Sequence, residues 1–203
     1  MAERDWRRLL SFKCSGCGNC CRGTFVPVTD GDVRRMLEGT GRPVTELVRL
    51  VKLGDIRMDK RHGWWARIGD TKAVMALPWK RGHCAYLDAP TNRCMVYESR
   101  PLVCRSTPLE VHFTDSGAVE KLTRHLVTSC PNDWEKGSQS LRALAVLDRL
   151  RDRESDAYCE KVAAWNKQKD VARTPANFYV WLGLAPAARL RRPAAPARAV
   201  AAR

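Results

Sequence analysis

The stretch that decides how this chain folds is Cys14-Ser15-Gly16-Cys17-Gly18-Asn19-Cys20-Cys21, which places four cysteines within eight residues. The two residues between Cys14 and Cys17 allow a tight turn to aim both sulfurs at one metal ion. The glycines suit such a turn, because glycine adopts a positive φ without a steric penalty. If the backbone at Cys20 and Cys21 is extended, the two side chains leave on opposite faces and serve different metals or different edges of one cluster. The run therefore predicts a thiolate-rich metal site.

A second group of cysteines lies in the middle of the chain, at Cys84, Cys94 and Cys104, with nine residues between successive members. Residues 88–93 predict a loop between two short strands, and such a hairpin would bring Cys84 and Cys94 side by side. Pro101 suits the first turn of a helix that would carry Cys104 back toward that pair. Cys130 would be an eighth ligand, and eight ligands make two sets of four.

Two motifs carry a resemblance to a known family. They are Phe12-x-Cys14-x-x-Cys17-Gly18-x-Cys20-Cys21 and Cys94-x-Val96-Tyr97-x-x-Arg100-Pro101-x-x-Cys104-Arg105-x-x-Pro108, in this order along the chain. Together they resemble the YkgJ-type cysteine cluster family, which is described as a zinc- or iron-chelating domain. The resemblance covers residues 12–131 and implies chelation without an assigned reaction. Asn132 follows Cys130-Pro131 where we would expect glycine, and the segment after about residue 134 lies outside the resemblance.

The candidate metal ligands are all cysteines: Cys14, Cys17, Cys20, Cys21, Cys84, Cys94, Cys104 and Cys130. Thiolates bind zinc, iron and iron–sulfur clusters, so the ligand type leaves the choice of metal open. The spacing matches the bacterial ferredoxin run only in part, and it is not that of a zinc ribbon. No catalytic residue and no binding residue for another cofactor is predicted.

Several other side chains could support the site. The histidines are spare ligands at best, and His83 beside Cys84 is the first to consider; the four are His62, His83, His112 and His125. Cys159 lies among helical residues far from the other cysteines, so we expect a buried structural thiol. Arg100 and Arg105 flank the central cysteines, where guanidinium groups would lower cysteine pKa values and offset the charge of the site.

The composition of the 203-residue chain is that of a soluble globular protein, with 44% hydrophobic and 29% charged residues and a formal net charge of +14. No run approaches the roughly 18 apolar residues of a membrane span, and residues 1–13 hold no signal-peptide core. We therefore expect a cytoplasmic protein without a membrane partner. In that compartment thiols stay reduced, and cysteine clusters bind metals more often than they form disulfides.

Three functions stay open at this point. The first is chelation of zinc or iron with an unassigned downstream role, in which metal binding contributes to folding. The second is an iron–sulfur redox protein or a protein-modifying enzyme that uses the same ligands. The third is a basic nucleic-acid-binding adaptor, because a strongly positive chain attracts phosphates, although its Lys and Arg residues are spread out. Phosphate loops, zinc-protease motifs and nucleophile elbows are absent from the sequence, and no protein partner is predicted.

The predicted fold is α+β, with a small antiparallel sheet and short helices around the cysteine-rich site in residues 1–133. Thr29 and Asp30 are candidate caps for a helix through Leu37. A second helix is expected to begin at Pro43 and to continue to Gly54. Strands are expected at residues 62–68, 73–79 and 109–113.

A helical segment is predicted at residues 134–184. Its leucines, Leu141, Leu144, Leu147 and Leu150, recur at helical intervals. Thr174 and Pro175 would begin a final helix. Residues 185–203 contain almost only Ala, Pro and Arg, which predicts a disordered basic tail.

Overall fold

The computed structural model describes residues 6–14, 16–23, 25–124 and 137–186. The helices are the 3-10 helices η1 (Trp6–Ser11) and η2 (Asn19–Cys21), α1 (Asp30–Thr40), α2 (Val44–Leu47), α3 (Leu102–Ser106), α4 (Leu141–Lys167) and α5 (Pro175–Trp181). The strands are β1 (Arg49–Lys52), β2 (Ala66–Ile68), β3 (Thr71–Ala76), β4 (Trp79–Lys80), β5 (His83–Cys84), β6 (Leu87–Asp88), β7 (Arg93–Cys94), β8 (Leu109–Phe113) and β9 (Val119–Arg124). The predicted α+β class, with small antiparallel sheets and a helical C-terminal segment, is confirmed.

The largest sheet has three antiparallel strands in the order β1-β3-β2. The segment that follows the N-terminal cysteine run attaches to the central strand. The Val28 N–H donates to the Met75 carbonyl at 2.9 Å, and the Leu77 N–H donates to the Val26 carbonyl at 2.9 Å. The sheet therefore fixes the chain directly behind the cysteine run.

Helix α1 begins immediately after this attachment. The Thr29 side chain accepts a hydrogen bond from the Asp32 N–H, and the Asp32 side chain accepts one from the Thr29 N–H. These two bonds form a capping box, which satisfies backbone donors that the first helical turn leaves unpaired. The helix ends before Gly41, which adopts a left-handed conformation with φ of 66°. The predicted start of the helix at Thr29 is confirmed.

The main hydrophobic core lies among α1, the three-stranded sheet, α4 and α5. Met36 and Met75 meet Tyr158, Trp165 and Phe178 from the C-terminal helices, and all five side chains are fully buried. The predicted helical periodicity forms a single 27-residue helix, α4. Thr174 caps α5, as predicted. The C-terminal helices thus complete the core that supports the N-terminal half of the chain.

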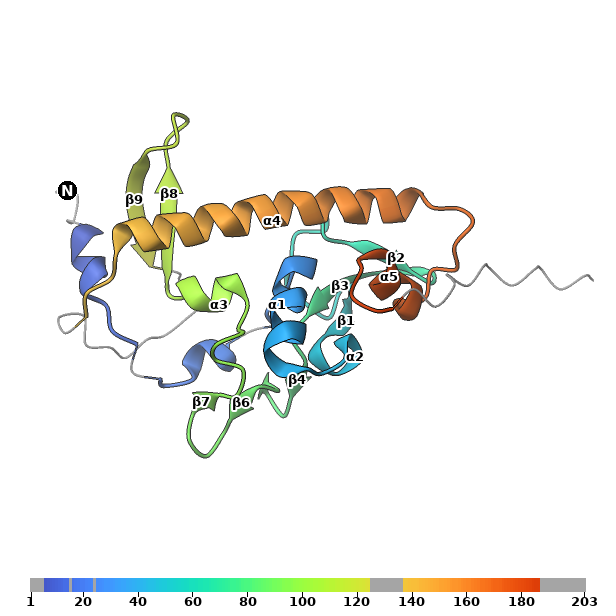
Figure 1. Cartoon of the computed structure of the whole chain (residues 1–203), viewed down its shortest axis with the longest axis horizontal. Coiled ribbons are helices and arrows are strands. Elements are labelled where there is room, and N and C mark those ends of the chain that lie inside the picture. Colours follow the sequence, from blue (N-terminus) through green and yellow to red (C-terminus); the bar gives the residue numbers. More distant parts are fainter. Residues whose placement is uncertain (1–5, 15, 24, 125–136, 187–203) are drawn as a thin grey trace, which may run out of the picture.

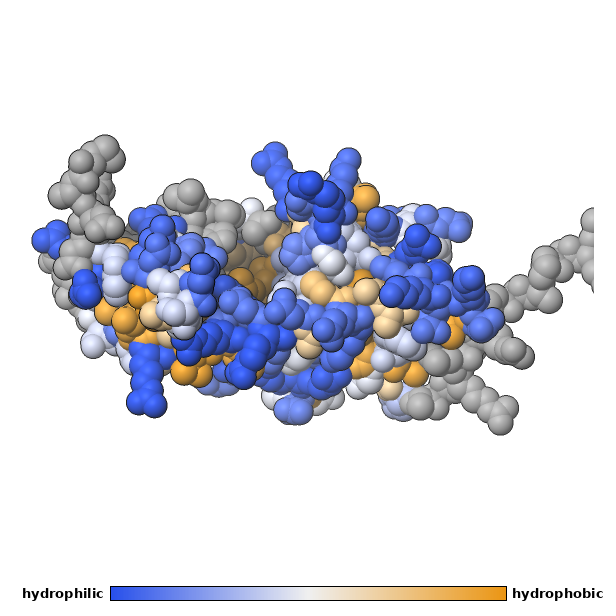
Figure 2. Space-filling model, turned by 90° about the horizontal axis from the view of Figure 1, so that it is seen from above, coloured by the Kyte–Doolittle hydropathy of each residue, from blue (hydrophilic) through white to orange (hydrophobic). Residues whose placement is uncertain are grey.

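A smaller core surrounds the N-terminal end of α4 and contains Phe12, Leu109, Val111, Leu122 and Leu144. Figure 1 shows η1 and the β8–β9 hairpin at one end of the long helix, with the three-stranded sheet and α5 toward its other end. Figure 2, seen from above, shows a hollow between these two parts with apolar side chains inside it. The predicted strand at residues 109–113 is β8, and its partner β9 was not predicted.

The helix predicted from Pro43 to Gly54 is wrong beyond Leu47. Val48 is extended, with φ of −136° and ψ of 164°, and strand β1 follows it. Val51 pairs with Val74 across the sheet, and branched side chains such as valine pack well in a strand. Pairing with β3 therefore outweighs the helical spacing of the leucines. Strand β2 also begins later than predicted, at Ala66 instead of residue 62.

Some predictions fall outside the described residues. They concern the eighth ligand Cys130, the spare ligand His125 and residues 187–203 of the predicted disordered tail. The predicted division of the chain at residues 133 and 134 stays a prediction. Among the described helices, none combines the length and the apolar character that crossing a membrane requires.

Candidate metal centre

The N-terminal cysteine run has two glycines with a left-handed backbone and one short helix. Gly16 and Gly18 both have positive φ, at 68° and 70°, as the sequence predicts. Gly18 then begins the 3-10 helix η2, which carries Cys20 and Cys21. The sulfurs of these two adjacent residues lie 3.9 Å apart. The extended backbone considered for this pair is wrong, because the helical turn directs both thiols to the same space.

The cysteine run packs against the β6–β7 hairpin. Arg22 Nη2 donates to Asn92 Oδ1 at 2.5 Å, and Arg22 Nη1 donates to the Cys17 carbonyl at 3.3 Å. The contact is close, because a Cβ atom on Gly18 would lie 3.1 Å from Leu87 Cδ1. Two segments 70 residues apart in sequence are therefore held together at the site.

Cys84 and Cys94 belong to two successive short hairpins. Cys84 lies in β5 opposite Trp79, and Cys94 lies in β7 opposite Leu87. The predicted pairing of Cys84 with Cys94 is wrong in register, because β5 pairs back to β4 and leaves β6 to pair with β7. The Met95 N–H also donates to the Tyr86 carbonyl at 2.8 Å, which extends the second hairpin toward Cys84.

Cys104 lies on helix α3, which begins after Pro101, as predicted. Pro101 supplies no side-chain cap. Instead, the Leu102 N–H donates to Asp32 Oδ1 at 2.8 Å, so a carboxylate of α1 caps this short helix. The position of Cys104 therefore depends on a contact between two helices that are distant in sequence.

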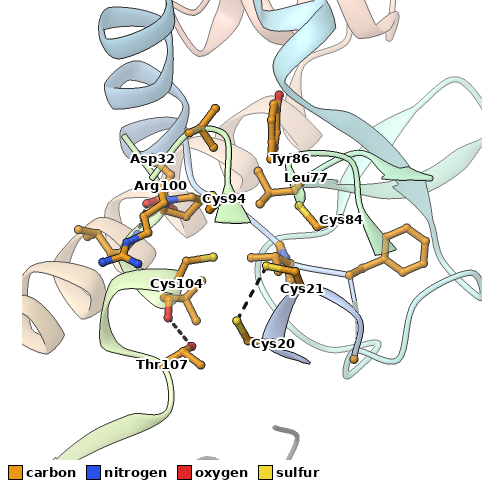
Figure 3. Close-up of a pocket in the computed structure, with 18 of the residues that line it drawn as sticks. Cys20, Cys21, Asp32, Leu77, Cys84, Tyr86, Cys94, Arg100, Cys104 and Thr107 are labelled. Carbon is orange, nitrogen blue, oxygen red and sulfur yellow. Dashed lines mark hydrogen bonds between the residues drawn. The ribbon is translucent and has the colours of Figure 1, made fainter. Parts of the chain in front are cut away.

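These elements surround a cavity of about 1200 Å³. Seven of the eight predicted ligands line it: Cys14, Cys17, Cys20, Cys21, Cys84, Cys94 and Cys104. Figure 3 shows the sulfurs of Cys20, Cys21, Cys84 and Cys104 turned toward a common space. Within the residues that the structure describes, no three Cys, His, Asp or Glu side chains are close enough to hold one ion. The fold gathers the thiols around one cavity, and it does not show the closed metal site that the sequence predicts.

We call Cys20, Cys84, Cys94 and Cys104 the inner thiols. Burial is the largest cause that raises the pKa of Cys84, Cys94 and Cys104, and for Cys104 the other three inner thiols raise the pKa further. The pKa of Cys20 is raised first by its hydrogen bond with Cys21 and then by burial. The inner thiols are thus within electrostatic reach of one another, and their ionised forms would repel each other.

The two arginines that flank the central cysteines have different roles. The positive charge of Arg100 lowers the pKa of Cys20 and of Cys94, which offsets part of the rise, as predicted. Arg105 instead donates to the carbonyls of Glu98 at 2.7 Å and of Arg100 at 3.0 Å. Arg105 therefore holds the loop that carries Arg100, and the predicted direct effect on thiolates belongs to Arg100.

Among the spare ligands, His62 lines the cavity. His83 does not, and its Nδ1 lies 2.8 Å from the carbonyl oxygen of Cys84. His112 hydrogen-bonds Thr123 at 2.7 Å in the β8–β9 hairpin. Cys159 is outside the cavity on α4, and it is half-buried instead of fully buried.

Sequence reasoning did not place the polar residues Asp32 and Tyr86 on the cavity wall. The Tyr86 hydroxyl donates to the Leu47 carbonyl at 2.9 Å, and burial raises the Tyr86 pKa to about 12. The spacing from Thr29 to Asp32 is a sequence signal for the capping box. The bond from Leu102 to Asp32 has no such signal, because it joins segments 70 residues apart.

The donor set fits a soft cation. Thiolates are preferred ligands of zinc and of iron in clusters, and metal binding requires their deprotonated form. A cation among the inner thiols would reverse the repulsion and burial effects that now raise their pKa values. Arg100 supplies only part of that positive charge.

Comparison with known proteins gives one family and one curated relative. The model of the CxxCxxCC family, whose description is "Putative zinc- or iron-chelating domain", matches residues 13–131. A Methanocaldococcus jannaschii protein with the name "Uncharacterized protein MJ0661" is 28% identical over 102 residues, which cover 50% of this chain and 47% of the relative. The chain thus spans about half the length of that relative. No solved structure matches the chain.

Proposed function

The chain belongs to the CxxCxxCC family, and from this premise we propose that it binds zinc or iron through the cysteine thiolates of the cavity. The family description supports chelation, and the downstream role of the bound metal is a separate question. The observation that carries the proposal is the convergence of cysteines from separate parts of the chain. The N-terminal run, the two central hairpins and helix α3 all contribute thiols to one cavity wall.

The inner thiols are the proposed first ligands. Four thiolates satisfy the tetrahedral preference of zinc, and they also suit an iron–sulfur cluster. Cys14, Cys17 and Cys21 line the same cavity and would supply further ligands, with Cys130 as the eighth. When bound, zinc would link the chain segments, whereas iron in a cluster would also carry electrons. Both forms need reduced thiols, which favours the cytoplasm as the compartment.

Metal and sulfide analysis tests this proposal. The protein is purified without oxygen, and zinc, iron and acid-labile sulfide are measured in the wild type, in Cys94→Ser and in Cys159→Ser. We expect Cys94→Ser to weaken metal binding by about tenfold or more, since even residues outside the ligand shell of a metal site contribute tenfold or more to affinity. Cys159→Ser is the matched control, because Cys159 lies outside the cavity.

The outcomes separate the alternatives. A colourless protein with zinc and no sulfide supports the zinc form, and a coloured protein with iron and sulfide supports a cluster. Equal loss of metal in Cys94→Ser and Cys159→Ser would show that a thiol in the cavity contributes no more to metal binding than a thiol outside it. A wild-type protein that retains no metal above the level of a protein without a cysteine cluster contradicts the proposal.

A further inference from the structure

Asp32 makes contacts that link the site to the core of the protein. The residue is almost fully buried, at 5% exposure. Oδ2 accepts hydrogen bonds from the N–H and the hydroxyl of Thr29, each at 3.1 Å. Oδ1 accepts from Arg35 Nη2 at 2.7 Å and from the Leu102 N–H at 2.8 Å. One side chain therefore caps two helices, α1 to which it belongs and α3.

The bond to Leu102 matters because α3 is only five residues long. The first N–H groups of a helix have no partner within the helix, and Pro101 at the cap position offers none from its side chain. Isolated helices of this length are unstable in water. Helix α3 also packs against α4, and the hydrogen bond to Asp32 fixes its first turn, which carries Cys104 two residues after Leu102.

Asp32 is itself held rigidly. Arg35, which binds Asp32 Oδ1, also donates to both carboxylate oxygens of Glu154 on α4, at 2.5 and 2.8 Å. The contacts run from α3 through Asp32 and Arg35 to the long helix that completes the main core. Figure 3 shows Asp32 on the wall of the same cavity as Cys104.

We propose that Asp32 is the positioning residue of Cys104, which it holds toward the other inner thiols by fixing the first turn of α3. This inference rests on the proposed metal binding for its consequence, since a misplaced Cys104 would remove one ligand. Asp32 is not itself a proposed ligand, because its carboxylate oxygens accept hydrogen bonds from protein donors.

Asp30 offers a matched control on the same helix. It is equally buried, at 2% exposure, and its Oδ2 forms ion pairs with Lys161 at 2.6 Å and with Arg34 at 2.8 Å. Neither of these contacts reaches α3. Asp30→Asn should therefore lower the stability of the fold without moving Cys104.

The test compares Asp32→Ala, Asp32→Asn and Asp30→Asn with cobalt(II) as the probe, because its thiolate charge-transfer absorption grows with the number of sulfur ligands. We expect Asp32→Ala to lose absorption per bound cobalt and to bind it about 10- to 100-fold more weakly. Asp32→Asn keeps an oxygen that accepts from the Leu102 N–H. This variant should therefore recover most of the absorption and most of the affinity for cobalt. Asp30→Asn should keep the full absorption even where its melting temperature falls.

A second measurement keeps the inference testable without metal. In the metal-free protein, alkylation of Cys104 is followed by peptide mass spectrometry, and Asp32→Ala should react several-fold faster than the wild type, Asp30→Asn and Asp32→Asn. Asp32→Asn is the control for charge, because the Asp32 carboxylate also raises the pKa of Cys104. Equal alkylation rates, or equal cobalt spectra in Asp32→Ala and Asp30→Asn, would overturn the positioning role. A wild type that binds no cobalt would contradict the proposed metal binding but not the positioning role. The alkylation rates would then decide the role of Asp32.

Discussion

The two halves of the cysteine set are held in different ways. In the N-terminal half, Cys14 is exposed, and the 3-10 helix η2 is the one regular element among the described residues of the run. In the central half, Cys84 is buried, and paired strands or a capped helix carry each of the three cysteines. The central half is therefore preorganised by the fold, whereas the N-terminal half has little structure of its own.

Because of this difference, we expect the two halves to respond differently to metal binding. A preorganised set of thiols costs little conformational entropy when it binds an ion. A loop held by few contacts opens locally at low free energy, and a bound metal would stabilise it by closing it onto the central half. We therefore expect metal binding and ordering of the N-terminal run to be coupled.

Metal removal should produce the largest effect. In hydrogen exchange of the metal-loaded protein before and after chelation, we expect the amides of residues 16–23 to lose about 100-fold in protection, equivalent to about 2.7 kcal/mol of ligand stabilisation. The amides of β5, β7 and α3 should lose much less, since strand pairing and the Asp32 cap persist. Amides of α4 serve as the internal control. Equal losses in both halves would contradict the distinction between them.

Substitution of two glycines in the N-terminal run should have a smaller effect on stability, and it tests how that run contacts the central half. Gly16 and Gly18 have nearly the same positive φ, but a Cβ atom on Gly16 would meet no atom within 4 Å. On Gly18 it would lie 2.7 Å from Arg22 Nη1 and 3.1 Å from Leu87 Cδ1. Gly16→Ala should cost about 1 kcal/mol of unfolding free energy from backbone strain. Gly18→Ala adds crowding against Leu87 of the hairpin, while the flexible end of Arg22 can move aside, and should cost about 2 kcal/mol.

Denaturant unfolding of both variants at one fixed metal concentration measures this difference. The two alanines share the same backbone strain, so their difference reports how tightly Gly18 packs against the β6–β7 hairpin. Equal costs would mean that the N-terminal run does not rest on this hairpin in solution.

The sequence predicted the gathering of the cysteines better than their local arrangement. Spacing and glycine content identified the N-terminal turn, and seven of the predicted ligands line one cavity. The predicted pairing of the central strands was wrong. Strands of two residues show too little hydrophobic periodicity to indicate which neighbouring strand they pair with. Cys84 could pair forward or back, and only the folded chain selects Trp79 as its partner.

Contacts between distant segments were beyond local reasoning. The capping box at Thr29 follows from spacing, but the second use of Asp32 at Leu102 requires α1 and α3 to be placed first. In the same way, residues 49–52 have the spacing of a helix and become a strand because β3 offers an edge. Tertiary pairing overrides local preference at residues 49–52.

The smallest expected effect concerns Arg22, which links the two halves directly. Arg22→Ala removes the hydrogen bonds to Asn92 and to the Cys17 carbonyl. Because Arg22 is exposed, we expect a cost of about 0.5–1 kcal/mol. If the link holds the N-terminal run closed over the metal, the metal should dissociate about two- to fivefold faster, the same free energy expressed as a rate.

Arg93→Ala is the matched control, because it removes an exposed arginine next to Asn92 in the β6–β7 hairpin without removing either of these bonds. Transfer of zinc to a chromogenic chelator gives the dissociation rate for both variants. A loss of charge near the site would speed dissociation equally in both, whereas a lost link would act only in Arg22→Ala. Equal rates in Arg22→Ala and the wild type would mean that Gly18 packing and the metal alone hold the two halves together.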